Sequence, residues 1–122
     1  MRFSASHKIR KASDFAHLRA KGSRFNCGSF VLIGAERSAD EKMLPFPRFA
    51  VIASKKLVGN HAVDRNRAKR IFREIFRRNR NSLSATWDFL LIARRSSLAV
   101  PFEKLSEQFA AGARFLCTSQ QS

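Results

Sequence analysis

The sequence lacks the features that mark membrane-spanning and secreted proteins. No apolar run approaches the roughly 18 consecutive residues that a membrane-spanning helix needs, and the N-terminus has no apolar segment of the kind found in signal peptides. Cys27 and Cys117 are too few and too far apart for a disulfide framework or a CxxC site. We therefore expect a cytoplasmic protein without membrane association, in which both thiols are buried.

Residues that carry catalysis or hold metals are also sparse. His7, His17 and His61 have no second ligand at metal-binding spacing and no nearby Ser, Cys or acid that would suggest a catalytic triad. The five glycines are isolated, so the sequence has no glycine-rich phosphate-binding loop. The sequence therefore predicts no catalytic residue and no metal ligand in this protein.

Acidic residues are the scarcer charged group. The chain has 24 Lys and Arg but 9 Asp and Glu, which gives a formal net charge of +15 over 122 residues. Such an excess is typical of a protein that binds a large polyanion. A hydrophobic content of 44%, with 12 Phe, is enough for one modest core. We expect one domain over residues 1–122, monomeric when it is alone.

Short apolar runs and helix signals predict an α+β fold. The predicted strands are β-rich runs at residues 30–33, 49–53 and 89–93, with a shorter one at 24–26. Ser13 can cap a first helix that Gly22 would end. With the basic helix described next and a final helix, the order is αβββαβα, a single-domain α/β sandwich of a sheet packed against helices.

The final helix is expected to begin at Pro101, because proline is favoured in a first helical turn. After it, residues 118–122 are polar and are expected to form a disordered tail.

The segment from Arg65 to Arg80 combines an apolar stripe with a basic face at helical period. The stripe consists of Ala68, Ile71, Phe72, Ile75 and Phe76, and the opposite side carries Arg67, Arg70, Arg73 and Arg77. Glu74 is the only acid among eight Lys and Arg, so few ion pairs within the helix can neutralise this face. A helix face that is almost entirely positive is more typical of a surface that binds an external polyanion, nucleic acid above all, than of an ordinary solvated surface.

The basic helix and the loop before it carry a recognisable pattern. Ser54-Lys55-Lys56, a short loop with Gly59, and Arg65-Asn66-Arg67-Ala68-Lys69-Arg70 resemble the SKK and RNRxKR signature of the bacterial ribonuclease P protein subunit. Flanking blocks match in the same order, namely Lys11 with Asp14-Phe15, Phe30-Val31-Leu32 and residues 88–94. The resemblance covers roughly residues 8–115. One RNR alone would be a weak signal, but these ordered blocks are specific.

The resemblance implies a protein that assists a catalytic RNA. In this family the protein binds a large catalytic RNA, and the complex removes the 5′ leader from precursor tRNA. Mg²⁺ held mainly by the RNA activates the water, so no catalytic side chain is expected from the protein. The resemblance also implies a left-handed β-α-β crossover around the basic helix, whereas about 98% of such crossovers are right-handed. The start of the helix would then lie beside an open sheet face, in a cleft for the leader.

The resemblance also assigns the site residues. The RNA-contacting set is Arg65, Asn66, Arg67, Lys69, Arg70 and Arg73, in which the forked donors of arginine suit phosphate oxygens. The leader-binding cleft would use Lys11, Phe15, Lys55, Lys56 and Arg65. Asn66 could instead cap backbone locally, and Phe15 could be a core residue.

The chain departs from the family pattern at two positions. Arg19 and Ile33 stand where family members often have aromatic residues, and the chain contains no Tyr. Leader binding would then depend less on base stacking and more on backbone charge.

Three other classes of protein share the basic composition. A ribosomal or other structural RNA-binding protein would have no reason to carry the ordered SKK and RNR blocks. A sequence-specific DNA-binding protein would need a base-reading helix, and no helix-turn-helix is recognisable. A self-sufficient nuclease would need an acid-base or metal constellation that the sequence does not show.

Overall fold

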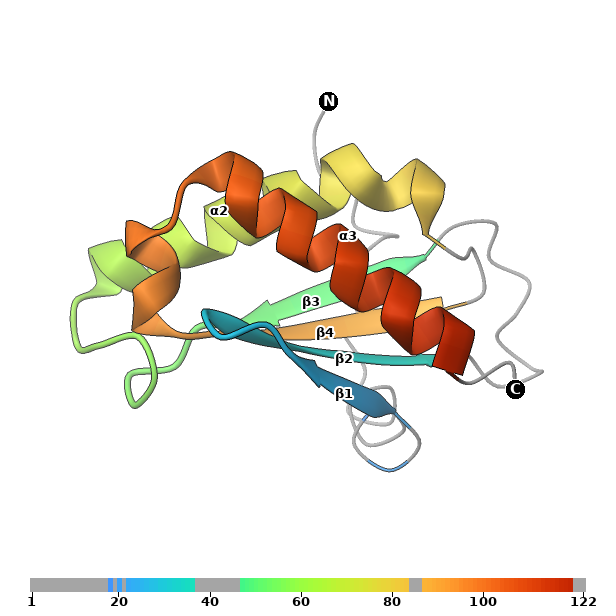
Figure 1. The fold of residues 1–122 in the computed structure, drawn as a ribbon. Helices are drawn as coiled ribbons and strands as arrows, with labels where there is room; N and C mark the ends of the chain where they lie inside the picture. The colour runs from blue at the N-terminus through green and yellow to red at the C-terminus, as the bar shows by residue number, and fades with distance from the viewer. Residues whose placement is uncertain (1–17, 19, 21, 37–46, 84–86, 120–122) are drawn as a thin grey trace.

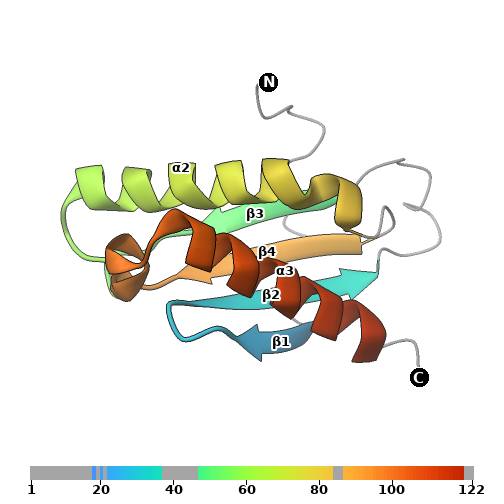
Figure 2. The same cartoon turned by 45° about the horizontal axis from the view of Figure 1, so that its top comes forward.

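The computed structural model describes residues 18, 20, 22–36, 47–83 and 87–119. Within these ranges, four strands form one sheet and two long helices lie across one of its faces (Figure 1, Figure 2). The strands are β1 (Ser23–Asn26), β2 (Phe30–Glu36), β3 (Arg48–Ile52) and β4 (Trp87–Ala93). The helices are α2 (Ala62–Asn79) and α3 (Phe102–Ser119), and the short 3-10 turns are η3 (Arg80–Ser82) and η4 (Arg95–Ala99). The predicted α+β class is confirmed.

The strand order in the sheet is β1-β2-β4-β3. β2 pairs antiparallel with both β1 and β4, whereas β3 runs parallel to β4. Parallel neighbours need a crossover connection, and α2 provides it. The basic helix therefore lies in a β-α-β unit, as the family resemblance implies. The handedness of this unit stays a prediction.

Element bounds differ from the predicted ones by a few residues. The second strand extends to Glu36, and α3 begins at Phe102, one residue after Pro101. The Pro101 carbonyl accepts hydrogen bonds from the Lys104 and Leu105 N–H groups, both at 3.1 Å, so this proline precedes the helix and caps its first turn. α3 continues through Ser119, so the expected tail of residues 118–122 begins no earlier than residue 120. Residues 120–122 lie outside the described residues.

The predicted first helix lies mostly outside the described residues, and so does Ser13. Leu18 and Ala20 are helical, and the Gly22 N–H donates to the Leu18 carbonyl at 2.8 Å. A Cβ at Gly22 would lie 2.2 Å from that carbonyl oxygen, so a larger residue would clash with the backbone. Gly22 therefore closes this segment, as the sequence predicts.

The sheet separates two apolar clusters. The larger cluster fills the space between the sheet and the two helices, where the Phe49 and Phe76 rings stack with centroids 4.7 Å apart. The predicted stripe of α2 is confirmed, since Ala68, Phe72, Ile75 and Phe76 are fully buried and Ile71 is half-buried. The smaller cluster lies on the opposite face of the sheet and consists of Leu18, Ile33, Ala35 and Leu90.

The two cysteines differ from the expectation of buried thiols. Cys27 and Cys117 are each only half-buried, and neither takes part in a disulfide. Burial nevertheless raises the pKa of the Cys27 thiol to about 11. Cys27 is therefore protonated at neutral pH and behaves as a small packing residue.

A buried ion pair joins β3 to β4. Arg48 and Asp88 are register partners in the parallel pair, and the Asp88 side chain is 2% exposed. Arg48 donates from Nε to Oδ1 at 3.0 Å and from Nη2 to Oδ2 at 2.7 Å. This bidentate arrangement is strongly directional. It therefore favours one register of β3 against β4, and with it one position for the loop and helix that follow β3.

Asp88→Ala removes the carboxylate and leaves a buried guanidinium without this partner. We expect the free energy of unfolding, measured by urea denaturation at pH 7, to fall by about 3–5 kcal/mol. The double variant Arg48→Met/Asp88→Leu removes both charges at similar volume and should recover most of the lost stability. An Asp88→Ala protein with the urea midpoint of the wild type would show that the pair does not stabilise the sheet.

Candidate nucleic-acid interface

Helix α2 carries the six predicted RNA-contacting residues along its first three turns. Burial follows the helical period, because residues that face the sheet lose contact with water and residues a half-turn away do not. Asn66, Arg67, Arg70 and Arg73 are exposed, whereas Arg65 and Lys69 are half-buried beside the apolar stripe. Arg65 and Lys69 therefore lie at the border between the apolar stripe and the exposed basic face.

A shallow surface hollow of about 460 Å³ runs along this helix. Its lining consists of Val63, Asn66, Lys69, Arg70 and Arg73. Sequence reasoning did not single out Val63, which is 74% exposed. Its spacing of three residues from Asn66 and seven from Arg70 would have placed it on the same helical face. The hollow therefore offers three cations, an amide and one apolar contact to a ligand.

Glu74 divides the basic face of α2 into two parts. Its carboxylate accepts hydrogen bonds from the guanidinium groups of Arg77 and Arg78, the latter at 3.1 Å. The hydrogen bond from Arg77, with a further one from Arg78, lowers the pKa of Glu74 to about 2. Arg78 also lies over the Phe102 ring of α3, 4.8 Å from its centroid. The positive charge of the last turn is thus reduced, but not cancelled, by an acid of the same helix.

The first three turns of α2 differ from the last one in their ion pairing. Within the part of the chain that the structure describes, no salt bridge reaches Arg67, Lys69, Arg70 or Arg73. Like charges along one helical face repel each other, and water and counterions alone screen them here. This part of the helix therefore retains its positive charge for an external anion.

A second basic group lies in the loop of residues 54–61, called here the SKK loop, between β3 and α2. Lys55 and Lys56 are exposed on a turn in which the Val58 N–H donates to the Ser54 carbonyl at 2.9 Å. Val58 is buried in the main core and anchors the loop. Arg65 connects the loop to the helix, because its Nη1 donates to the Gly59 carbonyl at 2.8 Å. The two predicted sets of residues thus meet at Arg65.

The face of the sheet opposite α2 and α3 carries a hollow of about 240 Å³. It is lined by Leu18, Gly22, Arg24, Ile33, Ile52, Leu90 and Ile92. Among the described residues of this lining, Arg24 alone is charged, and it is the register partner of Ile33 on β2. Ile33 itself is only 4% exposed, so it forms part of the floor. Lys11, Phe15 and Arg19 lie outside the described residues.

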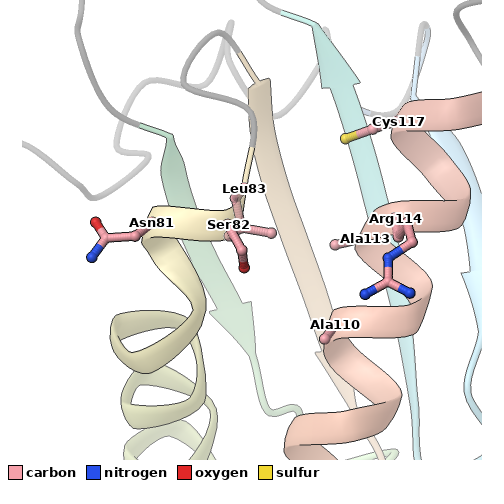
Figure 3. Close-up of a pocket in the computed structure, with 7 residues that line it drawn as sticks. All are labelled: Asn81, Ser82, Leu83, Ala110, Ala113, Arg114 and Cys117. Atoms are coloured by element: carbon pink, nitrogen blue, oxygen red, sulfur yellow. The ribbon is translucent and has the colours of Figure 1, made fainter.

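A third hollow, of about 350 Å³, lies between η3 and the second half of α3 (Figure 3). The described residues that line it are Asn81, Ser82, Leu83, Ala110, Ala113, Arg114 and Cys117. Among them Arg114 is the one cation, and none belongs to the predicted site. Figure 3 shows that the side chains come from two separate elements, η3 with the residue after it and α3. It is therefore distinct from the basic surface of α2.

The residues of the basic surface supply charge and hydrogen-bond donors. Among the described residues, no group of three or more His, Cys, Asp and Glu could hold a metal ion. The same part of the chain contains no helix with both the length and the apolar character needed to cross a bilayer. What this surface can do chemically is bind phosphates through Lys and Arg.

Comparison with known proteins places the chain in a family. The family model of Ribonuclease P matches residues 3–115. The ribonuclease P protein component of Syntrophus aciditrophicus is 33% identical over 97 residues, which cover 80% of this chain and 76% of that protein. The protein of the same name from Chromohalobacter salexigens is 36% identical over 106 residues, which cover 87% and 78%.

A solved structure shares the architecture. The RNase P protein of Staphylococcus aureus superposes with a TM-score of 0.71 at 26% identity, over 89% of this chain and 94% of that one. The family match, the two relatives and the fold agree with the signature around the SKK loop and α2. The chain therefore belongs to the ribonuclease P protein family.

Proposed function

We propose that this chain is the RNA-binding protein subunit of ribonuclease P and assists a catalytic RNA in removing the 5′ leader from precursor tRNA. The observation that carries the proposal is the unneutralised face of α2 beside the SKK loop. We infer the reaction from membership of the ribonuclease P protein family, and the basic surface gives the protein a means of binding the RNA that takes part in it. The partners are the catalytic RNA and precursor tRNA, and the setting is the cytoplasm.

The chemistry in this proposal is carried by the RNA subunit. The described residues do not fit a metal site, so we assign no step of the reaction to a metal held by the protein alone. Mg²⁺ would instead be held mainly by phosphates of the RNA, with oxygen ligands of the kind that this ion prefers. The protein, a monomer before assembly, contributes positive charge that lowers the cost of bringing two RNA molecules together.

Two surfaces divide the work in this proposal. The exposed side of α2, with Asn66, Arg67, Arg70 and Arg73, contacts the catalytic RNA. Lys55, Lys56 and Arg65, together with Lys11 and Phe15, contact the leader. The hollow on the sheet face opposite α2 and α3 supports this division, because Ile52 lines it and the SKK loop begins two residues later.

Leader release is the direct test of the proposed function. The purified protein, a bacterial ribonuclease P RNA and a precursor tRNA are mixed at low Mg²⁺, and the 5′ leader is resolved on a denaturing gel. We expect cleavage that requires the RNA and that the protein strongly stimulates. Cleavage by the protein without the RNA would instead show a self-sufficient nuclease. No stimulation at any protein concentration would overturn the proposal.

The affinity for RNA should depend strongly on salt concentration, because the described residues of the proposed interface carry positive charge without compensating acids. With roughly five to eight phosphates neutralised, log K should fall against log salt with a slope of about −4 to −7, at about 0.7 to 0.9 per phosphate. Filter binding to the catalytic RNA between low and moderate salt measures this slope. A flat response would contradict a phosphate-binding interface.

Arg67, Arg70 and Arg73 are exposed and should contribute little to folding. Replacing each by Ala should change the free energy of unfolding by no more than about 0.5 kcal/mol and reduce the salt slope of catalytic-RNA binding by about one. Arg114→Ala is the matched control, since it removes an exposed arginine from α3, outside this surface. Equal losses of RNA affinity in the control would mean that net charge, and not this face, determines binding.

A further inference from the structure

The SKK loop is held in place by a residue outside it. Arg95, in η4, donates its backbone N–H to the Leu57 carbonyl at 2.9 Å. Its side-chain Nη1 donates to the next carbonyl, that of Val58, at 3.0 Å. The same Nη1 lies 3.7 Å from the Asp64 carboxylate in the first turn of α2. One residue thus joins the loop, the end of β4 and the start of the basic helix.

A second arginine completes the arrangement. The Arg65 guanidinium donates a hydrogen bond to the Gly59 carbonyl. Three consecutive carbonyls, those of residues 57, 58 and 59, therefore accept hydrogen bonds from two arginines, Arg65 and Arg95. Backbone carbonyls in an exposed loop would otherwise bond to water and leave the loop free to sample many conformations. Lys55 and Lys56 themselves make no hydrogen bond or ion pair among the described residues, so their ammonium groups are available.

Gly59 makes the arrangement sensitive to a single methyl group. Its φ of +136° lies in a region that residues with a side chain rarely adopt. A Cβ at Gly59 would lie 2.8 Å from Arg95 Nη1, closer than real contacts allow. The loop conformation and the position of the Arg95 side chain therefore depend on each other.

We propose that Arg95 is a positioning residue for leader binding: it holds the SKK loop so that Lys55 and Lys56 face the leader as a fixed pair. The proposal rests on the proposed function. Holding the loop before binding lowers the entropy cost of ordering it against RNA. The Arg95 side chain is 65% exposed, so water competes for its bonds and its effect on global stability is small.

The first test compares precursor and mature tRNA, which differ by the leader. The affinity ratio of the two is measured for holoenzymes assembled with wild-type and Arg95→Ala protein at one salt and Mg²⁺ concentration. We expect Arg95→Ala to lower this ratio about five- to tenfold, in the range of coupling between neighbouring groups. Catalytic-RNA affinity and the thermal midpoint should stay near those of the wild type. An unchanged ratio overturns the proposal.

A thermodynamic cycle separates positioning from direct contact. In a Lys55→Ala/Lys56→Ala background the positioned groups are gone, so Arg95→Ala should lower the ratio by less than about twofold. If the full loss persists in that background, Arg95 contacts RNA itself and the positioning proposal is wrong. If wild-type protein neither binds the catalytic RNA nor stimulates cleavage, the proposed function itself fails, which is a different outcome from an unaffected ratio.

A second variant, Gly59→Ala, displaces the Arg95 side chain without changing Arg95 itself. Gly59→Ala should lower the precursor-to-mature ratio as Arg95→Ala does, and the double variant should lose no more than the stronger single one. Gly28→Ala is the matched control, because Gly28 also has a positive φ, +87°, but a Cβ there would meet nothing within 4 Å. A Gly59→Ala protein that folds, as judged by circular dichroism, and keeps the wild-type ratio would overturn the proposal.

Discussion

Burial of one side of α2 is the interaction on which the rest of this structure depends. The helix concentrates positive charge on its other side, and each like-charge neighbour costs a few tenths of a kcal/mol. Burying a side chain such as Phe72, Ile75 or Phe76 contributes about 1.5–3 kcal/mol. All three are fully buried against the sheet and α3. Packing therefore outweighs the repulsion, and the arginines remain exposed in fixed positions.

The distribution of charge along α2 breaks a general rule of helices. Basic residues stabilise the last turn of a helix and oppose the macrodipole in the first. Arg77 and Arg78 follow the rule in the last turn, and Asp64 does so in the first. Arg65, at the end of the first turn, does not follow it. Such local conflicts are concentrated at functional sites, which agrees with a surface kept positive for a ligand and not for the stability of the helix.

Local patterns in the sequence predict much of this fold. The stripe of α2, the strands and the closure at Gly22 each follow from residues within a few positions of one another. The signature around Lys55, Lys56 and Arg65 likewise marks the site. What could not be predicted lies in pairs far apart in the chain, such as Arg48 with Asp88 and Arg95 with Val58. These contacts follow from the strand order, which brings β4 beside β3 and so brings η4, which follows β4, into hydrogen-bonding contact with the SKK loop.

The order of the sheet also has a consequence for biosynthesis. β2 and β3 share no hydrogen bonds, because each pairs with β4, the last strand to be made. Before β4 is made, β1 and β2 can pair with each other, but β3 has no strand partner in this sheet and α2 cannot pack against the complete sheet. The sheet on which α2 and the SKK loop are placed is therefore complete only after β4, a single central strand, has joined β2 to β3.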